Sequence, residues 1–149
     1  MRIVVDTNIV FSGILNSSSR IDHILINSKK HFEFFTCNFL EAEISKHQGK
    51  LLKLTKLEPY ELAELQKLVT ANIIFINEQL IPPVEMLRAE TLLMDIDIND
   101  TPFVALTNYL DCKLWTGDKV LIEGLRDKGY EHTITTSELS QLLSEFEIR

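Results

Sequence analysis

Short apolar runs alternate along the chain with segments in which apolar residues recur at helical spacing. The first run, Arg-Ile-Val-Val at residues 2–5, is β-branched and stops at Asp6, which is the pattern of a fully buried strand. Further short strands are predicted at residues 34–37, 73–76, 113–116 and 133–135.

Helices are predicted between these strands, from apolar stripes within residues 21–25, 40–52, 62–69, 86–93, 103–110 and 137–146. Pro59 and Pro102 suit the first turns of two of them, and Thr136-Ser137 followed by Glu138 is a start signal for the last. Strands that alternate with helices predict an α/β fold of three layers, in which helices cover both faces of a central parallel sheet of about five strands.

The composition fits one globular domain over residues 1–149. Hydrophobic residues make up 45% of the chain and charged residues 25%, with only five Gly and four Pro. This is enough apolar material for a core, and it argues against a disordered chain. No internal repeat, heptad run or Ser/Gly-rich linker points to a second domain.

The net charge of −7 limits how the protein could bind nucleic acid and favours a site that binds cations. Proteins that bind nucleic acid through a general positive field are usually basic, so any binding to nucleic acid here must use a local patch. The excess of acids also suits a site that concentrates carboxylates in order to hold cations.

The chain carries no pattern typical of secretion or of a membrane span. Asp6 and Asn8 interrupt the first apolar run, and no apolar stretch reaches the ~20 residues that a spanning helix needs. Cys37 and Cys112 have no metal-ligand spacing and stand among apolar residues, so both are interpreted as small buried hydrophobes. We therefore expect a cytoplasmic protein without membrane association.

Two acids follow predicted strands. Asp6 ends the first strand, and Asp118 follows the strand at residues 113–116 across a turn at Gly117. Ligands of open parallel sheets bind beyond the carboxyl ends of the strands. If both strands belong to one parallel sheet, the two carboxylates lie on the same edge, where a ligand would bind.

Asp100 precedes a predicted helix, and two interpretations are open. A carboxylate at a helix start accepts hydrogen bonds from free backbone N–H groups, and capping alone explains a single Asp before Thr-Pro. Asp95, Asp97 and Asp100 cluster within six positions, however, and a cap needs only one acid. The cluster favours a site role for Asp100.

Helical phase distinguishes Glu43 from Glu41. Glu43 lies beside the apolar stripe of Leu40 and Ile44, whereas Glu41 shares its side of the helix with Ser45. A Glu on the inward side is costly unless a cation or a hydrogen-bond donor meets it. Glu43 is therefore the candidate site residue.

Four carboxylates in one cleft would repel each other, since two unit charges ~4 Å apart cost about 4 kcal/mol at an effective dielectric constant of about 20. A bound cation would relieve this cost. Oxygen ligands without Cys or a His cluster favour Mg²⁺ or Mn²⁺ over Zn²⁺. Phosphoryl chemistry is the natural reaction class for such a site.

These residues resemble the motifs of the PIN-domain (PilT N-terminus) ribonucleases, many of which are toxins of toxin–antitoxin pairs. The motifs are VVDTN at 4–8, Glu43, DINDTPFVALT at 97–107 and LWTGD at 114–118, and together they extend over nearly the whole chain. The resemblance implies four catalytic, metal-binding acids and two supporting polar residues: Asp6, Glu43, Asp100 and Asp118, with Asn8 and Thr116.

The same resemblance implies an endoribonuclease that uses Mg²⁺ or Mn²⁺ to hydrolyse RNA phosphodiester bonds. It further implies a small antitoxin protein as partner, with homodimerisation common among similar proteins. The chain departs from the family pattern at Val120, where relatives often carry a further Asp. Asp97 is a candidate outer-sphere ligand in its place, and a solvated loop charge is the equal alternative.

Lys46, Lys50 and Lys53 recur at i, i+4 and i+7, on the helix predicted to carry Glu43. Contact with RNA phosphates is one interpretation of this basic stripe, and an ordinary solvated face is the favoured one. Lys29, Lys30 and His31 form a second small basic patch with the same two interpretations.

Two other functions stay open. A noncatalytic PIN-like module would bind RNA or protein and need not bind metal. A phosphatase or phospho-acceptor domain would also use a strand-end Asp, but haloacid-dehalogenase-like enzymes usually carry a second Asp two residues later, where this chain has Asn8. The metal-dependent ribonuclease is the leading hypothesis.

Overall fold

The computed structural model describes residues 1–16 and 19–148, and in these residues five parallel strands form one sheet. The order across the sheet is β3-β2-β1-β4-β5, so the first strand of the chain lies at the centre. The bounds are β1 (Arg2–Val5), β2 (Glu33–Cys37), β3 (Ile73–Ile76), β4 (Lys113–Trp115) and β5 (Thr133–Ile134). The predicted α/β fold is confirmed, and each strand lies within one residue of its expected bounds.

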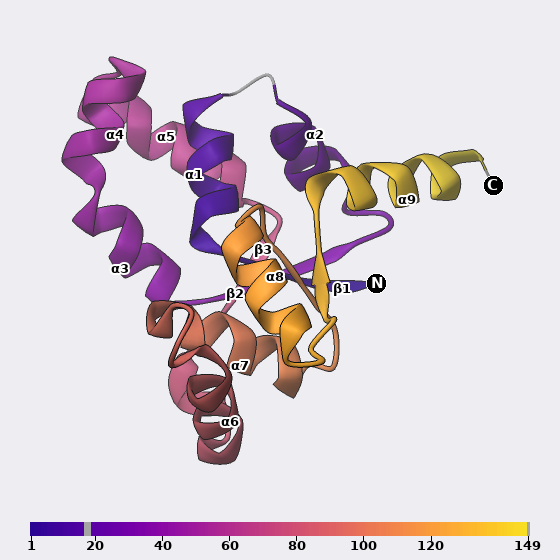
Figure 1. Ribbon diagram of the computed structural model, residues 1–149. Helices are drawn as coiled ribbons and strands as arrows, with labels where there is room; N and C mark the ends of the chain where they lie inside the picture. Colours follow the sequence, from indigo (N-terminus) through magenta and orange to yellow (C-terminus); the bar gives the residue numbers. More distant parts are fainter. Residues whose placement is uncertain (17–18, 149) are drawn as a thin grey trace.

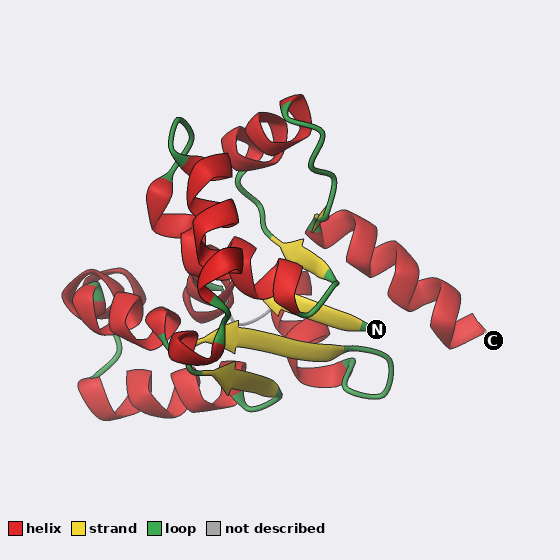
Figure 2. Ribbon diagram, turned by 90° about the horizontal axis from the view of Figure 1, so that it is seen from below, coloured by secondary structure: helices red, strands yellow, loops and turns green. Residues whose placement is uncertain are grey.

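Helices cover both faces of this sheet and make three layers (Figure 1, Figure 2). One layer contains α1, α2 and α5, which pack against each other, and the opposite layer contains α6 and α7. The helices are α1 (Thr7–Leu15), α2 (Arg20–Asn27), α3 (Phe39–Lys46), α4 (Gln48–Thr55), α5 (Pro59–Thr70), α6 (Pro83–Leu93), α7 (Thr101–Tyr109), α8 (Lys119–Asp127) and α9 (Thr136–Ile148). Short 3₁₀ turns at Glu78–Leu80 and Ile98–Asp100 precede α6 and α7.

The helix α1 has no counterpart among the predicted helices. The outer side of the helix carries the apolar Phe11 and Leu15 beside Asn8 and Ser12, so no clear polar stripe marks a helical period in the sequence, although the buried residues all lie on one side. These residues are Thr7, Ile9, Val10, Gly13 and Ile14. The contacts that bury them come from α2, which follows α1 in the chain, and from α3, α4 and α5, which are more distant in sequence.

The stripe predicted over residues 40–52 is not one helix but two. The helical bonds end at His47, which has φ −103° and ψ 15° and serves as C-cap of α3 and N-cap of α4. Gly49, in the first turn of α4, lowers the local helix propensity. The expectation of a basic stripe on the helix that carries Glu43 is therefore wrong, because Lys50 and Lys53 belong to α4.

The core is built on the central strands. Trp115 of β4 is fully buried and its ring lies 5.8 Å from that of Phe34 in β2. Cys37 is fully buried, as expected, whereas Cys112 is only half-buried. Burial raises the pKa of the Cys37 thiol to about 12 and that of Cys112 to about 11, so both thiols stay protonated at neutral pH. Within the described part of the chain, no helix is both long and apolar enough to span a bilayer.

Candidate active site

The pairing of β1 with β4 brings two acids to one edge of the sheet. The strands are parallel neighbours, with Val5 opposite Trp115. Asp6 follows β1 directly, and Asp118 follows β4 after a short turn. The structure therefore places both at the carboxyl ends of adjacent strands, which is the geometry that the sequence predicted.

Each of these acids also caps the helix that it precedes. An oxygen of Asp6 accepts a hydrogen bond of 3.0 Å from the backbone N–H of Ile9, and Asp118 accepts one of 3.2 Å from Leu121. A cap fixes the side-chain rotamer, because the carboxylate must face the first turn of its helix. Capping thus orients both carboxylates before any ligand is bound.

Thr116 links the same two acids. Its side chain is fully buried, and its hydroxyl oxygen accepts a hydrogen bond of 3.1 Å from the backbone N–H of Asp118. A hydrogen bond from the same side chain acts on the Asp6 carboxylate and lowers its pKa. Thr116 therefore lies between the strand-end acids and contacts both.

Glu43 reaches the sheet edge from α3. It is half-buried, whereas Glu41 is exposed, as helical phase predicted. The hydroxyl of Thr7 donates a hydrogen bond to the Glu43 carboxylate, so the first residue of α1 holds the acid of α3 in place. Thr7 was not among the predicted site residues. The signal available in the sequence is its position between Asp6 and Asn8.

Asp100 lies at the end of the 3₁₀ turn that leads into α7, in the N-cap position. Its side chain makes no capping hydrogen bond. One physical reason is Pro102, the second residue of the helix, which has no N–H to donate. Capping therefore does not explain why an acid stands at position 100. The Asp100 side chain is half-buried, and this burial and the negative charges of the other acids raise its pKa.

Asp6, Glu43, Asp100 and Asp118, named here the acid cluster, lie within electrostatic range of one another. Burial above all, together with the charges of Asp97 and of the other three acids, raises the pKa of Asp100 to about 7. Burial also raises the pKa of Asp6 to about 6, against hydrogen bonds from Thr116 and Ile9, with Asp118 and Glu43 adding repulsion. Full ionisation of the cluster is therefore costly unless positive charge is added.

The PIN domain family model matches residues 4–144, a range that contains the whole acid cluster. This chain belongs to the PIN domain family. The resemblance noted in the sequence motifs is thereby confirmed.

A solved structure similar to this PIN domain is the crystal structure of VapBC2 from Rickettsia felis bound to a DNA fragment from their promoter. The TM-score is 0.69 at 14% sequence identity, over 91% of this chain and 98% of that chain. At this identity the likeness shows a shared fold. No curated protein matches the chain.

The donor atoms that this PIN domain gathers suit a hard cation. The acid cluster offers only carboxylate oxygens, the ligands that Mg²⁺ and Mn²⁺ prefer. Among residues 1–16 and 19–148, no three His, Cys, Asp or Glu side chains stand as a closed ligand set. The carboxylates therefore lie within electrostatic reach of each other rather than in a preformed cage.

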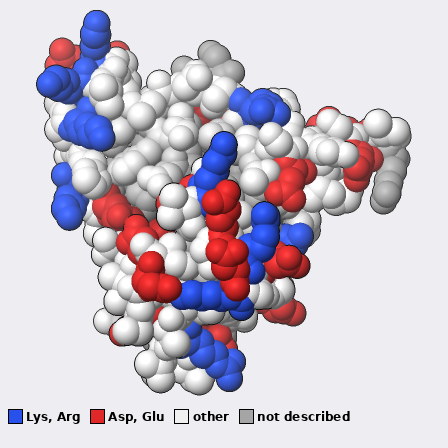
Figure 3. Space-filling model, in the orientation of Figure 1, with Lys and Arg blue, Asp and Glu red and all other residues white. Residues whose placement is uncertain are grey.

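The other predicted residues of the PIN domain occupy varied positions. Asn8 is exposed in the first turn of α1, and Asp97 is exposed with its carboxylate accepting a 3.0 Å bond from the N–H of Asn99. Acidic side chains gather between α3 and the start of α7, and basic side chains cover α4 above them (Figure 3). The basic side chains first considered for RNA contact, Lys46, Lys50 and Lys53, are all exposed.

The second basic patch lies away from the acid cluster. Lys29, Lys30 and His31 precede β2, so they lie at the opposite edge of the sheet from the carboxyl ends of the strands. The ring of His31 stacks on Phe146 of α9 at 5.5 Å. This patch therefore does not border the acid cluster.

Proposed function

We propose that this PIN domain is a Mg²⁺- or Mn²⁺-dependent endoribonuclease and the toxin of a toxin–antitoxin pair. The observation that carries the proposal is the acid cluster: four carboxylates from separate elements gather at a single sheet edge, where burial and the neighbouring acids raise the pKa of Asp6 and of Asp100. Proteins rarely hold such repulsion without a use for it, and perturbed carboxyl groups gather at functional sites.

In this proposal Asp6, Glu43, Asp100 and Asp118 hold the cation. A bound divalent ion supplies a Lewis acid that orients the phosphodiester and lowers the pKa of a water nucleophile. Asp97 is exposed beside the cluster and would act in the outer sphere. Asn8 and Thr116 support the site, as does Thr7, which positions Glu43 through its hydroxyl.

A noncatalytic PIN-like module that binds RNA or protein is the competing function. PIN domains are typically nucleases, and this chain keeps an acid at each of the four positions of the family pattern. A binding module has no need of a carboxylate set that resists ionisation. Catalysis is therefore the better-supported function.

The decisive experiment is cleavage of mixed single-stranded RNA with Mn²⁺ and with EDTA. Wild type should cleave only with the metal, and Asp6→Asn, Asp100→Asn and Glu43→Gln should each lose about a hundredfold in rate or more. The matched control is Glu41→Gln, which removes an exposed acid from the same helix and should leave the rate unchanged.

Metal-independent cleavage, or Glu43→Gln and Asp6→Asn variants as fast as wild type, would reject the nuclease assignment. A wild-type protein that binds RNA but does not cut it with Mn²⁺ would support the noncatalytic module. Circular dichroism of each variant separates lost chemistry from lost folding.

The partner proposed for this nuclease is a small antitoxin protein. Support comes from the resemblance to toxin-type PIN domains and from the shared fold with a VapBC2 structure. A basic segment would complement the acid cluster and the net charge of −7. Expression alone should arrest growth, and coexpression of a small protein encoded beside it should restore growth. Normal growth in the first case would count against the toxin role.

A further inference from the structure

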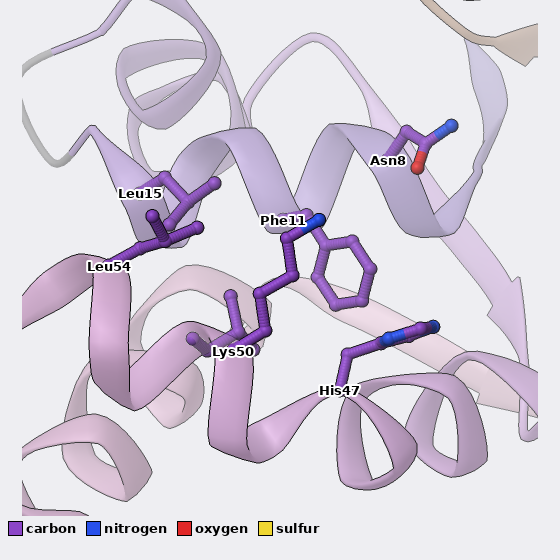
Figure 4. A pocket seen from close by; sticks show the side chains of 7 residues that line it. Asn8, Phe11, Leu15, His47, Lys50 and Leu54 are labelled. Atoms are coloured by element: carbon purple, nitrogen blue, oxygen red, sulfur yellow. The ribbon is translucent and has the colours of Figure 1, made fainter.

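A pocket of about 250 Å³ lies between α1 and α4 (Figure 4). It is named here the α1–α4 pocket. Its walls are apolar on one side, where Leu15 and Leu54 meet, and polar on the other, where Asn8 stands. Between them lie the rings of Phe11 and His47, with the Lys50 side chain running across the opening.

The pocket joins the proposed active site through two helices. Asn8 and Phe11 follow Asp6 within the first turns of α1, and His47, the C-cap of α3, follows Glu43 by four residues, ~6 Å along the helix axis. The backbone N–H of His47 donates to the Glu43 carbonyl at 3.1 Å, so the two residues are rigidly connected. A strand of RNA held at the acid cluster would place a neighbouring nucleotide in this pocket.

The lining combines two rings and one lysine with the apolar side chains of Leu15, Leu51 and Leu54. Phe11 and His47 meet edge to face, with ring centroids 5.7 Å apart at 88°, and both rings are half-buried. Among the described residues that line the pocket none is acidic, and Lys50 is exposed at its rim. In a protein of net charge −7, a basic aromatic pocket is a local exception.

We propose that the α1–α4 pocket binds a nucleobase of single-stranded RNA, next to the phosphate held at the acid cluster. The base stacks on Phe11 or His47, the Asn8 amide faces its edge, and the Lys50 ammonium pairs with the adjoining phosphate. Stacking on aromatic rings combined with a cationic phosphate contact is the usual means of binding single strands. This inference rests on the proposed ribonuclease function and adds the position of a flanking nucleotide.

The pocket also separates the three lysines considered for RNA contact. Lys50 borders the pocket, whereas Lys46 and Lys53 lie outside its lining. Of the three, only Lys50 is assigned a phosphate. Lys53, exposed on the same helix α4, provides a matched control.

The test measures RNA binding in EDTA, so that it does not depend on cleavage. A short fluorescein-labelled single-stranded RNA is titrated with wild type, Phe11→Leu, Lys50→Ala and Lys53→Ala, and anisotropy gives the Kd at several salt concentrations. Phe11→Leu keeps apolar bulk but removes the ring, and should weaken binding about tenfold. Lys50→Ala should lower the slope of log K against log salt by about 0.7, the value for one phosphate of a single strand. Lys53→Ala should match wild type.

A second measurement locates the base. RNA carrying photoreactive iodouridine should crosslink to the peptide that contains Phe11 or to the one that contains His47. Unchanged Kd values and salt slopes in all three variants, with crosslinks elsewhere, would overturn the inference while metal-dependent cleavage still stood. Loss of binding in the two pocket variants from a protein that cuts no RNA would uphold the pocket and reject the nuclease.

A protein partner is the other class of occupant. If RNA binding is unchanged in every variant, but Phe11→Leu and Lys50→Ala alone lose a small protein that copurifies with wild type, the pocket belongs to that partner. The nucleobase assignment is then wrong.

Discussion

Asp22, in the first turn of α2, is a buried carboxyl group outside the acid cluster. It is 3% exposed, and within the described part of the chain its Oδ1 atom has no hydrogen-bond partner. Burial raises its pKa to about 6, so ionisation at neutral pH costs folding energy. In sequence it is an ordinary acid of a helix N-terminus, where the dipole favours negative charge. Its burial depends on other helices, which explains why the sequence does not reveal it.

Replacement of this carboxyl by an amide should stabilise the protein in a pH-dependent way. With the folded pKa raised from 3.8 to about 6, the native state binds more protons than the unfolded chain in this window, so wild type loses stability as pH rises through it. Asp22→Asn cannot ionise, and should gain about 1 kcal/mol relative to wild type at pH 8. The gain should vanish near pH 4.

Urea unfolding at both pH values measures the difference. Comparison of variant with wild type at each pH removes the titration of Asp6 and Asp100, which both proteins share. If Asp22→Asn changes the free energy of unfolding equally at the two pH values, ionisation of the Asp22 carboxyl does not destabilise the folded protein.

The residues of the acid cluster differ in how far the sequence predicts their positions. Asp6 and Asp118 follow from strand ends, and Glu43 from helical phase. Asp100 has a capping alternative in the sequence, and only the structure shows that its side chain caps nothing. The hydrogen bond from the Thr7 hydroxyl to Glu43 depends on the contact between α1 and α3. This is a tertiary contact that no local pattern encodes.

At the scale of elements, the packing of α1 on α2 depends on the absence of one side chain. A Cβ added at Gly13 would lie 2.6 Å from the Oδ1 atom of Asp22 and 3.2 Å from a methyl group of Val69. Gly49 of α4 has nothing within 4 Å of the same position. Two helical glycines of the same chain therefore experience opposite surroundings.

Alanine at these glycines should change stability in opposite directions. Gly13→Ala should destabilise by about 1 kcal/mol, because overpacking outweighs the gain in helix propensity. Gly49→Ala should stabilise by about 0.5–1 kcal/mol, because only the propensity changes. Thermal unfolding of both variants and wild type checks the signs. Stabilisation by Gly13→Ala would mean that α1 and α2 are farther apart than described.

Most elements with a clear period are predicted from the sequence. An exception is α8, which is not among the predicted helices although its buried residues Leu121, Ile122 and Leu125 lie on one side of the helix. The five strands and the helices with Pro in the first turn emerge from local pattern. Helix α1 does not, because Phe11 and Leu15 place apolar residues on its outer side as well. The sequence does not predict the break at His47 either, because the apolar stripe continues across it and only the backbone angles change.

At the scale of the whole molecule, a cation bound at the acid cluster should stabilise the fold. A ligand that binds only the folded state at about a hundred times its Kd adds about 2.7 kcal/mol, which for a chain of this size is a rise of roughly 5–10 °C in Tm. Mn²⁺ should give such a rise in wild type and in Glu41→Gln. It should give none in a variant that combines Asp6→Asn with Asp118→Asn.

Differential scanning fluorimetry in EDTA and in Mn²⁺ measures these shifts without any RNA. An equal rise in the double variant would place Mn²⁺ elsewhere on the protein.

The order of the sheet is the feature that local pattern cannot supply. Nothing in the apolar runs specifies that β4 pairs with β1 rather than with β3, and only that pairing brings Asp118 beside Asp6. The expectation that they share an edge was conditional on one parallel sheet.

The central position of β1 has a consequence for biosynthesis. β1 is synthesised before its neighbour β4 and before the acid that follows β4. A nascent chain therefore carries Asp6 for part of translation without Asp118 beside it. The two carboxylates converge only after β4 has been made and has paired with β1, so a polypeptide interrupted before that point lacks the assembled acid cluster.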